Sequence, residues 1–123
     1  MKAFNYDSRE SAWNPGCIVF ALRGYIDAHT VIEFEKAVNA AIDGGVRQVV
    51  LDISGLSYIS SAGIGAMMGL TRKLSQGGGD LVLLNPTPKV LAILEGLGFT
   101  KIFKIASSEE DAREKLKETQ SSA

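Results

Sequence analysis

The stretch that most constrains the fold runs from residue 48 to residue 76. Residues 48–53 form a short run rich in valine, leucine and isoleucine, which is typical of a strand covered on both faces. Residues 60–63 are small, and from Ser61 onward the apolar positions keep helical spacing up to the glycines at 77–79. A buried strand that leads through a short turn into a helix is typical of crossover units, so the sequence predicts a mostly parallel sheet.

The rest of the chain continues this alternation. Residues 3–23 predict an opening hairpin, because two strand-like runs flank the turn signature Asn14-Pro15-Gly16. Thr30 and Glu33 match a capping box that opens a helix ending at residue 43. Later segments predict two short strands and two helices, over residues 81–84, 88–95, 102–105 and from 107 onward. The expected fold is α/β, with a mixed, mostly parallel sheet of four to five strands and about four helices packed against it.

Length and composition predict one domain. The chain has 123 residues, 46% of them hydrophobic, which is enough for a single core. We expect this domain to span residues 1–118, with a disordered tail over residues 119–123. The single Cys17 lies within an apolar run and is interpreted as a small buried hydrophobic residue.

Charge and residue counts exclude several classes of function. With 13 basic and 14 acidic residues the net charge is −1, so we expect no direct binding to nucleic acid. One histidine and one cysteine offer no metal site, and no cofactor-binding motif is present. The sequence contains no apolar run long enough to span a membrane and no signal-like start, so we expect no membrane insertion and a cytoplasmic location.

The predicted topology brings three distant segments together. In a parallel sheet the loops that leave the carboxyl ends of the strands gather at one edge, where ligands and partners usually bind. Here these loops are residues 24–30, 54–61 and 85–87. We therefore expect the candidate binding residues to come from these loops and from the start of the following helix.

Two adjacent serines open the helix after the buried strand. A helix N-terminus has unpaired backbone N–H groups and about half a positive charge, so a serine there can cap the helix, bind an anion or carry a phosphate. One reading has one of Ser60 and Ser61 capping the helix while the other faces water. The alternative is phosphorylation, which adds negative charge at the positive end of the helix and repels an acidic or apolar partner surface.

Other chemistry is less well supported by the sequence. Ser61, His29 and Asp27 are the residue types of a nucleophilic triad, but no G-x-S-x-G nucleophile elbow is present, so we expect no catalytic residues. The glycines at 63, 65 and 69 do not have the spacing of a dinucleotide-binding turn. Gly65 and Gly69 are four residues apart, and this spacing predicts close approach of another backbone, either in the core or in a partner.

The segments Gly24-Tyr25-Ile26-Asp27 and VVLDISGLSYISSAGIG (residues 49–65) resemble the STAS domains of bacterial anti-sigma factor antagonists. The resemblance extends in element order from about residue 18 to residue 116. It implies the STAS fold and a partner-switching cycle. In that cycle the antagonist binds an anti-sigma factor that is also a serine kinase, a sigma factor is released, phosphorylation ends binding, and a phosphatase restores the unphosphorylated form.

The resemblance also implies roles for individual residues. The family's phosphate acceptor falls on Ser61, and Ser60 is the alternative acceptor. Ser60 stands where the family usually has aspartate, and Ala62 where it has a second hydroxyl residue. A stand-alone STAS interaction subunit of a transport or sensory complex, without phosphorylation, is therefore the alternative function. The expected partner-binding residues are Asp27, His29, Thr30, Ser60, Ser61, Ala62, Gly63, Gly65, Asn85 and Thr87.

Overall fold

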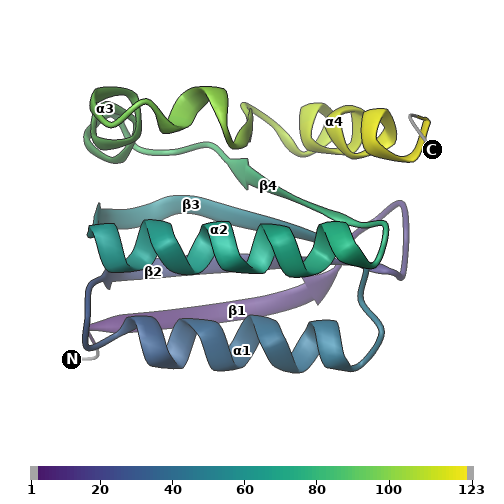
Figure 1. The fold of residues 1–123 in the computed structure, drawn as a ribbon, viewed down its shortest axis with the longest axis horizontal. Helices are drawn as coiled ribbons and strands as arrows, with labels where there is room; N and C mark the ends of the chain where they lie inside the picture. The colour runs from purple at the N-terminus through teal and green to yellow at the C-terminus, as the bar shows by residue number, and fades with distance from the viewer. Residues whose placement is uncertain (1–2, 122–123) are drawn as a thin grey trace.

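The fold is a single mixed sheet with helices on both faces (Figure 1). A computed structural model describes residues 3–121, with the side chains of residues 3–117. Within these residues the sheet has the strand order β1-β2-β3-β4-β5, with β1 antiparallel to β2 and all other pairs parallel. The strands are β1 (Phe4–Glu10), β2 (Cys17–Ile26), β3 (Gln48–Ile59), β4 (Asp80–Leu84) and β5 (Lys104–Ala106). The predicted α/β class and the mostly parallel sheet are confirmed.

The helices divide between the two faces of the sheet. They are α1 (Val31–Asp43), α2 (Ser61–Gln76), α3 (Pro88–Gly96), the short 3-10 helix η1 (Phe99–Lys101) and α4 (Glu109–Ser121). Side chains of α1, α2 and α3 share one core with the sheet, whereas α4 contributes to a second, smaller core. In Figure 1, α1 and α2 run along the strands, and α2 begins at the end of the sheet where β3 stops, the end at which α3 also lies.

Strand alternation explains the two cores. Along β3, Val49, Leu51 and Ile53 belong to the core under α1–α3, while Val50 belongs to the core under α4. These four side chains are completely buried. Burying an aliphatic side chain of this size contributes about 1.5–3 kcal/mol to the stability of the fold. The strand is apolar on both faces because helices cover both faces.

Cys17 contributes to the smaller core. Its side chain is completely buried, and burial raises the pKa of the thiol to about 11, although a hydrogen bond with Ser11 acts in the opposite direction. The thiol is therefore protonated at neutral pH. The interpretation of Cys17 as a buried hydrophobic residue is confirmed.

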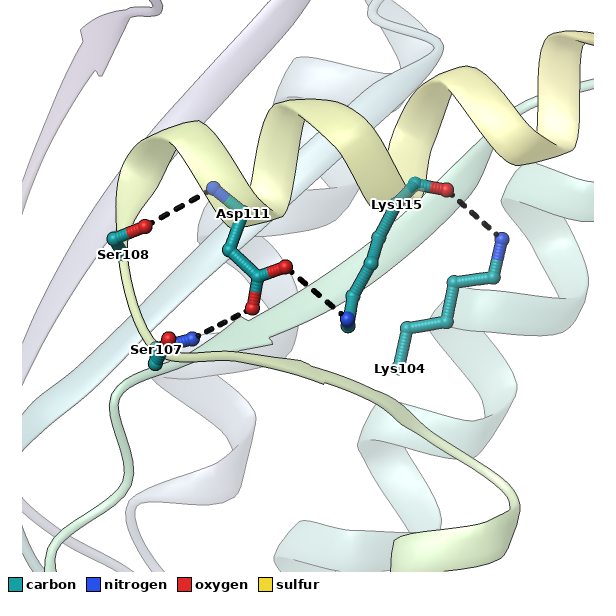
Figure 2. A network of polar contacts seen from close by, with 5 residues as sticks. All are labelled: Lys104, Ser107, Ser108, Asp111 and Lys115. Atoms are coloured by element: carbon teal, nitrogen blue, oxygen red, sulfur yellow. Dashed lines mark hydrogen bonds and ion pairs between the residues drawn. The ribbon is translucent and has the colours of Figure 1, made fainter.

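Helix α4 is fixed to the sheet by a polar network (Figure 2). The Ser108 hydroxyl accepts from the Asp111 backbone N–H at 3.0 Å, and the Asp111 carboxylate accepts from the Ser107 backbone N–H at 3.1 Å. These reciprocal bonds satisfy donors at the start of the helix. At the other side of the network, Lys104 of β5 donates to the carbonyl oxygen of Lys115 at 3.2 Å. The network therefore ties α4 to the edge of the sheet at its first turn and again at Lys115.

The glycines after α2 form the predicted helix stop. Gly77 is the C-cap, and Gly78 has a φ of +82°, a conformation that favours glycine. A Cβ on Gly79 would collide with the carbonyl oxygen of Arg47. A side chain at this position is excluded because the connector passes directly over the segment that precedes β3.

Several element boundaries differ from those predicted. Residues 24–26 and 54–59 were expected in loops but extend β2 and β3, whose pairing continues to Ile26 and Ile59 through two register shifts. The last strand begins at Lys104 rather than at residue 102, because residues 99–101 form η1. Helix α4 continues to Ser121, within the segment expected as a tail, and residues 122 and 123 lie outside the described residues.

Candidate functional site

The candidate site lies where β2 and β3 end together. The backbone N–H of Ser60 donates to the carbonyl oxygen of Ile26 at 2.8 Å, one residue beyond the last pair of the ladder. Ser57 Oγ donates to the carbonyl oxygen of Gly24 at 3.0 Å. The chain then turns directly into α2. The turn that carries the two serines is thus attached to both strands.

Ser60 and Ser61 have different roles in this turn. Ser60 is the N-cap of α2, with extended backbone, and its Oγ accepts from the backbone N–H of Gly63 at 3.4 Å. Ser61 is the first helical residue and is exposed. This arrangement agrees with the reading in which one serine caps the helix while the other faces solvent, with Ser60 as the cap.

The first turn of α2 contains no acidic residue. The partial positive charge at the N-terminus of this 16-residue helix is therefore not offset by a carboxylate within that turn. An anionic group on Ser61 would lie within the turn where this charge acts. The electrostatics of the turn are thus favourable for a phosphoserine.

Gly63 is the one expected partner-binding residue in the first turn of α2 that is buried. A Cβ built on it would lie 2.7 Å from Ile26 Cγ2 and 2.8 Å from Ile59 Cγ1. Its role in the fold is to let the first turn of α2 approach the ends of β2 and β3.

Gly65 and Gly69 have the opposite environment. Both are exposed, and a Cβ on either would meet no atom within 4 Å apart from its chain neighbours and the backbone of its own helix. Of the two sequence-based readings, close packing in the core is therefore wrong for these glycines. Ala62 is exposed as well. The face of α2 formed by Ala62, Gly65 and Gly69 therefore carries no side chain larger than a methyl group.

Asp27 organises the loop between β2 and α1. Its Oδ1 accepts from the backbone N–H groups of His29 at 2.9 Å and Thr30 at 3.0 Å. The hydrogen bond from the Thr30 N–H, followed by that from the His29 N–H, lowers the pKa of the Asp27 carboxyl below its ordinary value. Asp27 is consequently a charged loop anchor at neutral pH.

The expected capping box at Thr30 is not formed. Thr30 occupies the N-cap position, but its backbone is helical and its side chain makes no cap hydrogen bond. Its Oγ1 instead donates to the carbonyl oxygen of Tyr25 at 2.9 Å and accepts from the Asp27 backbone N–H at 2.9 Å. The carboxylate of Asp27 accepts from N–H groups that precede the helix, which the capping-box pattern did not anticipate.

The third segment joins the site through Thr87. Its Oγ1 accepts from the Val90 backbone N–H at 3.2 Å, as the N-cap of α3, and donates to the carbonyl oxygen of Leu56 at 3.3 Å. Asn85 is exposed, has a φ of +56°, and its backbone N–H donates to the carbonyl oxygen of Ala106 at 2.8 Å. The three segments that the topology predicted to converge are thus connected by hydrogen bonds.

The geometry does not assemble a nucleophilic triad. Within residues 3–117, no hydrogen bond joins the side chains of Ser61 and His29, and the hydrogen-bonded oxygen of Asp27 binds backbone N–H groups and the Thr30 hydroxyl. His29 is exposed. Among the described residues there is also no group of three or more side chains placed to hold a metal ion, and no helix has the length and hydropathy needed to cross a membrane.

Sequence reasoning missed one feature of this edge. Because residues 24–26 and 54–59 were assigned to loops, it did not place Tyr25 beside Tyr58, although the two are paired in the ladder. Both rings are partly exposed, at 38% and 42%. The sequence carried only a weak signal, because Leu56 and Ile59 are three residues apart and the two-residue alternation of a strand is broken by the register shifts between β2 and β3.

The fold and this edge define a small α/β domain with an exposed serine at the start of a helix. The STAS domain family model matches residues 9–112. BtrV of Bordetella bronchiseptica, which carries the name of an anti-sigma factor antagonist, is 37% identical over 97 residues, covering 79% of this chain and 84% of BtrV. The chain therefore belongs to the STAS domain family, among the anti-sigma factor antagonists.

Solved structures agree with this assignment. The anti-sigma factor antagonist SpoIIAA in its unphosphorylated form superposes with a TM-score of 0.74 at 26% identity, covering 94% of this chain and 96% of SpoIIAA. The Bacillus cell fate determinant SpoIIAA in its phosphorylated form gives a TM-score of 0.65 at 25% identity, covering 92% of this chain and 98% of that protein. The predicted STAS fold is confirmed.

Proposed function

We propose that this anti-sigma factor antagonist binds an anti-sigma factor with serine kinase activity in the cytoplasm, thereby releasing a sigma factor, and that phosphorylation of Ser61 ends the binding. The observation that carries the proposal is the division of roles between two hydroxyls. Ser60 caps α2, and Ser61 is exposed at the first helical position. Ser61 can therefore be modified without removing the cap. The phosphorylated form of a structural relative, SpoIIAA, supports the same reading.

The chemistry belongs to the partner, because this chain has no phosphate-binding loop of the P-loop type. In the kinase step, a bond forms between Ser61 Oγ and the γ-phosphorus of ATP while the bond from that phosphorus to ADP breaks. The hydroxyl proton passes to a base of the kinase. A phosphatase then hydrolyses the phosphoserine and returns the antagonist to its binding form. The antagonist itself acts as a binding protein and not as an enzyme.

The switch acts through charge. A phosphoserine carries about −1.5 to −2 charges at neutral pH, at a helix N-terminus that favours negative charge. The bare face formed by Ala62, Gly65 and Gly69 lies on the same helix and allows close approach of a partner. A charge at the end of this face repels an apolar or acidic partner surface while the domain keeps its fold.

Phosphorylation mapping tests the proposal. The full chain is incubated with ATP and with each purified serine-kinase anti-sigma factor of the same genome, and the product is examined by intact-mass spectrometry and peptide mapping. One phosphate on Ser61, absent in Ser61→Ala and present in Ser60→Ala, is the expected result. A phosphate that disappears only in Ser60→Ala would move the acceptor to Ser60.

The second candidate function is an interaction subunit of a transport or sensory complex. Ala62 and Ser60 favour it, because the turn has neither the second hydroxyl nor the aspartate usual in the motif. In that case none of the kinases would add a phosphate, while the same face of α2 would still bind a protein.

A further inference from the structure

The face of the sheet opposite α1–α3 is only partly covered. Helix α4 packs against β4 and β5, and the core beneath it also buries Cys17, Val19 and Val50. The part of this face toward the carboxyl ends of β2 and β3 is left open. By strand alternation this open part carries polar side chains. Arg23 forms a 3.0 Å ion pair with Asp7, and Asp52 accepts from the Ser54 hydroxyl at 2.7 Å. Such a surface is typical of a sheet face in contact with water.

Tyr25 and Tyr58 interrupt this polar surface. They are neighbours in the parallel register of β2 and β3, and the alternate residues Ile26 and Ile59 are buried under the helices. Tyr25 and Tyr58 therefore occupy paired positions on the open face, at its carboxyl end. Two large side chains exposed at 38% and 42% on neighbouring strands form an apolar patch within polar surroundings.

A cation borders the patch. Lys89 of α3 places its Nζ 5.8 Å from the centroid of the Tyr58 ring. The residue is exposed, and no carboxylate of the described residues pairs with it. An ammonium group above an aromatic ring, with its remaining donors open, is suited to receive a carboxylate from another molecule.

The patch is continuous with the candidate switch. Tyr58 precedes Ser61 by three residues, and the hydrogen bond from Ser60 N–H to Ile26 holds both strand ends at the turn. A partner that contacts Ser61 and the start of α2 therefore lies close to the ends of β2 and β3, which carry the two tyrosines.

We propose that Tyr25, Tyr58 and Lys89, the tyrosine patch, form a second contact surface for the anti-sigma factor, which presents there a carboxylate beside an apolar side chain. This inference rests on the proposed function. Tyrosines are enriched among the residues that contribute most to protein binding, and Lys89 provides the charge complementarity. A second copy of this chain fits less well, because the surface around two rings is charged and a stable interface requires about 800 Å² from each partner.

Affinity measurements with the purified serine-kinase anti-sigma factor test the patch. Tyr25→Thr and Tyr58→Thr remove the rings and keep a residue type that favours strands, and Lys89→Glu reverses the charge. We expect each variant to weaken binding by about tenfold or more, as measured by calorimetry on the full chain. Circular dichroism and a urea unfolding curve establish that each variant is folded.

Matched controls and the switch variant separate the two proposals. Ile32→Thr removes another exposed large side chain, on α1, and Lys101→Glu reverses another exposed lysine; both should bind like the wild type. Loss of binding in Ser61→Asp with unchanged binding in Tyr25→Thr, Tyr58→Thr and Lys89→Glu would overturn the patch and leave the proposed function intact. A wild-type chain that binds no anti-sigma factor would overturn both. Self-association of the wild type that Tyr58→Thr abolishes would overturn the patch as an anti-sigma factor surface and assign it to a second copy.

Discussion

The backbone N–H of Ser60 lies 2.8 Å from the carbonyl oxygen of Ile26, and this bond joins the ends of β2 and β3 immediately before α2 begins. Since Ser60 also caps the helix, the turn is held by its backbone on one side and by its side chain on the other. Ser61 projects from this fixed support. A phosphate there changes the charge of the surface without requiring the turn to move.

The two kinds of glycine in α2 predict opposite effects of the same substitution. Gly63→Ala should lower the free energy of unfolding by about 1–3 kcal/mol, because the new methyl group would lie within 3 Å of Ile26 and Ile59. Gly65→Ala should raise it by about 0.5–1 kcal/mol, because the position is open and alanine favours the helix. Urea unfolding of both variants checks this. Equal changes in the two would show that the first turn of α2 is not packed as described.

Gly65 is exposed in α2 although glycine disfavours helices, and measurements of anti-sigma factor binding should show its role. We expect Gly65→Leu to weaken binding of the anti-sigma factor strongly while the free domain stays at least as stable as the wild type. The bulky side chain would separate the two surfaces, whereas the space at the Cβ position is open in the free domain. Calorimetric titration together with thermal unfolding gives both quantities. Unchanged affinity in Gly65→Leu would remove this face of α2 from the interface.

The two serines should separate in a stability measurement. Ser60→Ala removes the cap of α2 and should cost about 0.5–1 kcal/mol, at the low end for a cap because the hydrogen bond is 3.4 Å long. Ser61→Ala should change the free energy of unfolding by less than about 0.5 kcal/mol, since surface substitutions usually do. The two variants differ by one position only and serve as mutual controls. If Ser61→Ala lowered the free energy of unfolding more than Ser60→Ala does, Ser61 and not Ser60 would be the cap of α2.

Phosphorylation of Ser61 should stabilise the free domain. Negative charge in the first turn of a helix contributes about 0.3–1 kcal/mol, and no carboxylate is present in the first turn of α2. We expect the Tm of the phosphorylated chain to be higher by about 1–5 °C at low salt, and the difference to shrink at high salt. Calorimetry of both forms tests this. A lower Tm after phosphorylation would mean that the phosphate disrupts the turn.

Asp27 predicts a pH dependence of stability. Its pKa in the folded protein lies below the ordinary value of 3.8, mainly because of the Thr30 backbone N–H and then that of His29. The stabilisation is therefore complete above pH 3.8 and is lost as the pH falls through the lower, folded pKa. Asp27→Asn should be less stable than the wild type at neutral pH, and the difference should narrow toward acid pH. Urea midpoints measured along this pH range give the comparison, and a constant difference would exclude the carboxylate as the cause.

Periodic patterns predicted the elements of this chain better than their ends. The apolar stripe of α1 and the valine-rich run of β3 each require burial, and the structure buries them. The last six residues of β3 were missed because Ser54, Gly55 and Ser57 are typical of loops, and only pairing with β2 makes them a strand. Long-range pairing of this kind leaves a weak local signal.

In the candidate site, too, the sequence predicted which residues are present but not the contacts that they make. Two adjacent hydroxyls at a helix start were visible in the sequence, but which of them caps α2 depends on backbone angles that the sequence does not display. Asp27 accepts from the N–H groups of His29 and Thr30, which precede the helix, because a carboxylate bonds readily to N–H groups two and three residues later. The burial of Gly63 depends on Ile26, which is distant in sequence and adjacent only in the fold.

We propose that a phosphate on Ser61 switches partner binding through its charge. The most direct test is calorimetric titration of the purified anti-sigma factor with the unmodified chain, with the chain phosphorylated on Ser61, and with the Ser61→Ala variant as control for the loss of the hydroxyl alone. We predict that the unmodified chain and Ser61→Ala bind with similar affinity and that the phosphorylated chain binds at least 100-fold more weakly, which corresponds to about 2.7 kcal/mol. Equal affinity of the phosphorylated and unmodified chains would contradict the account.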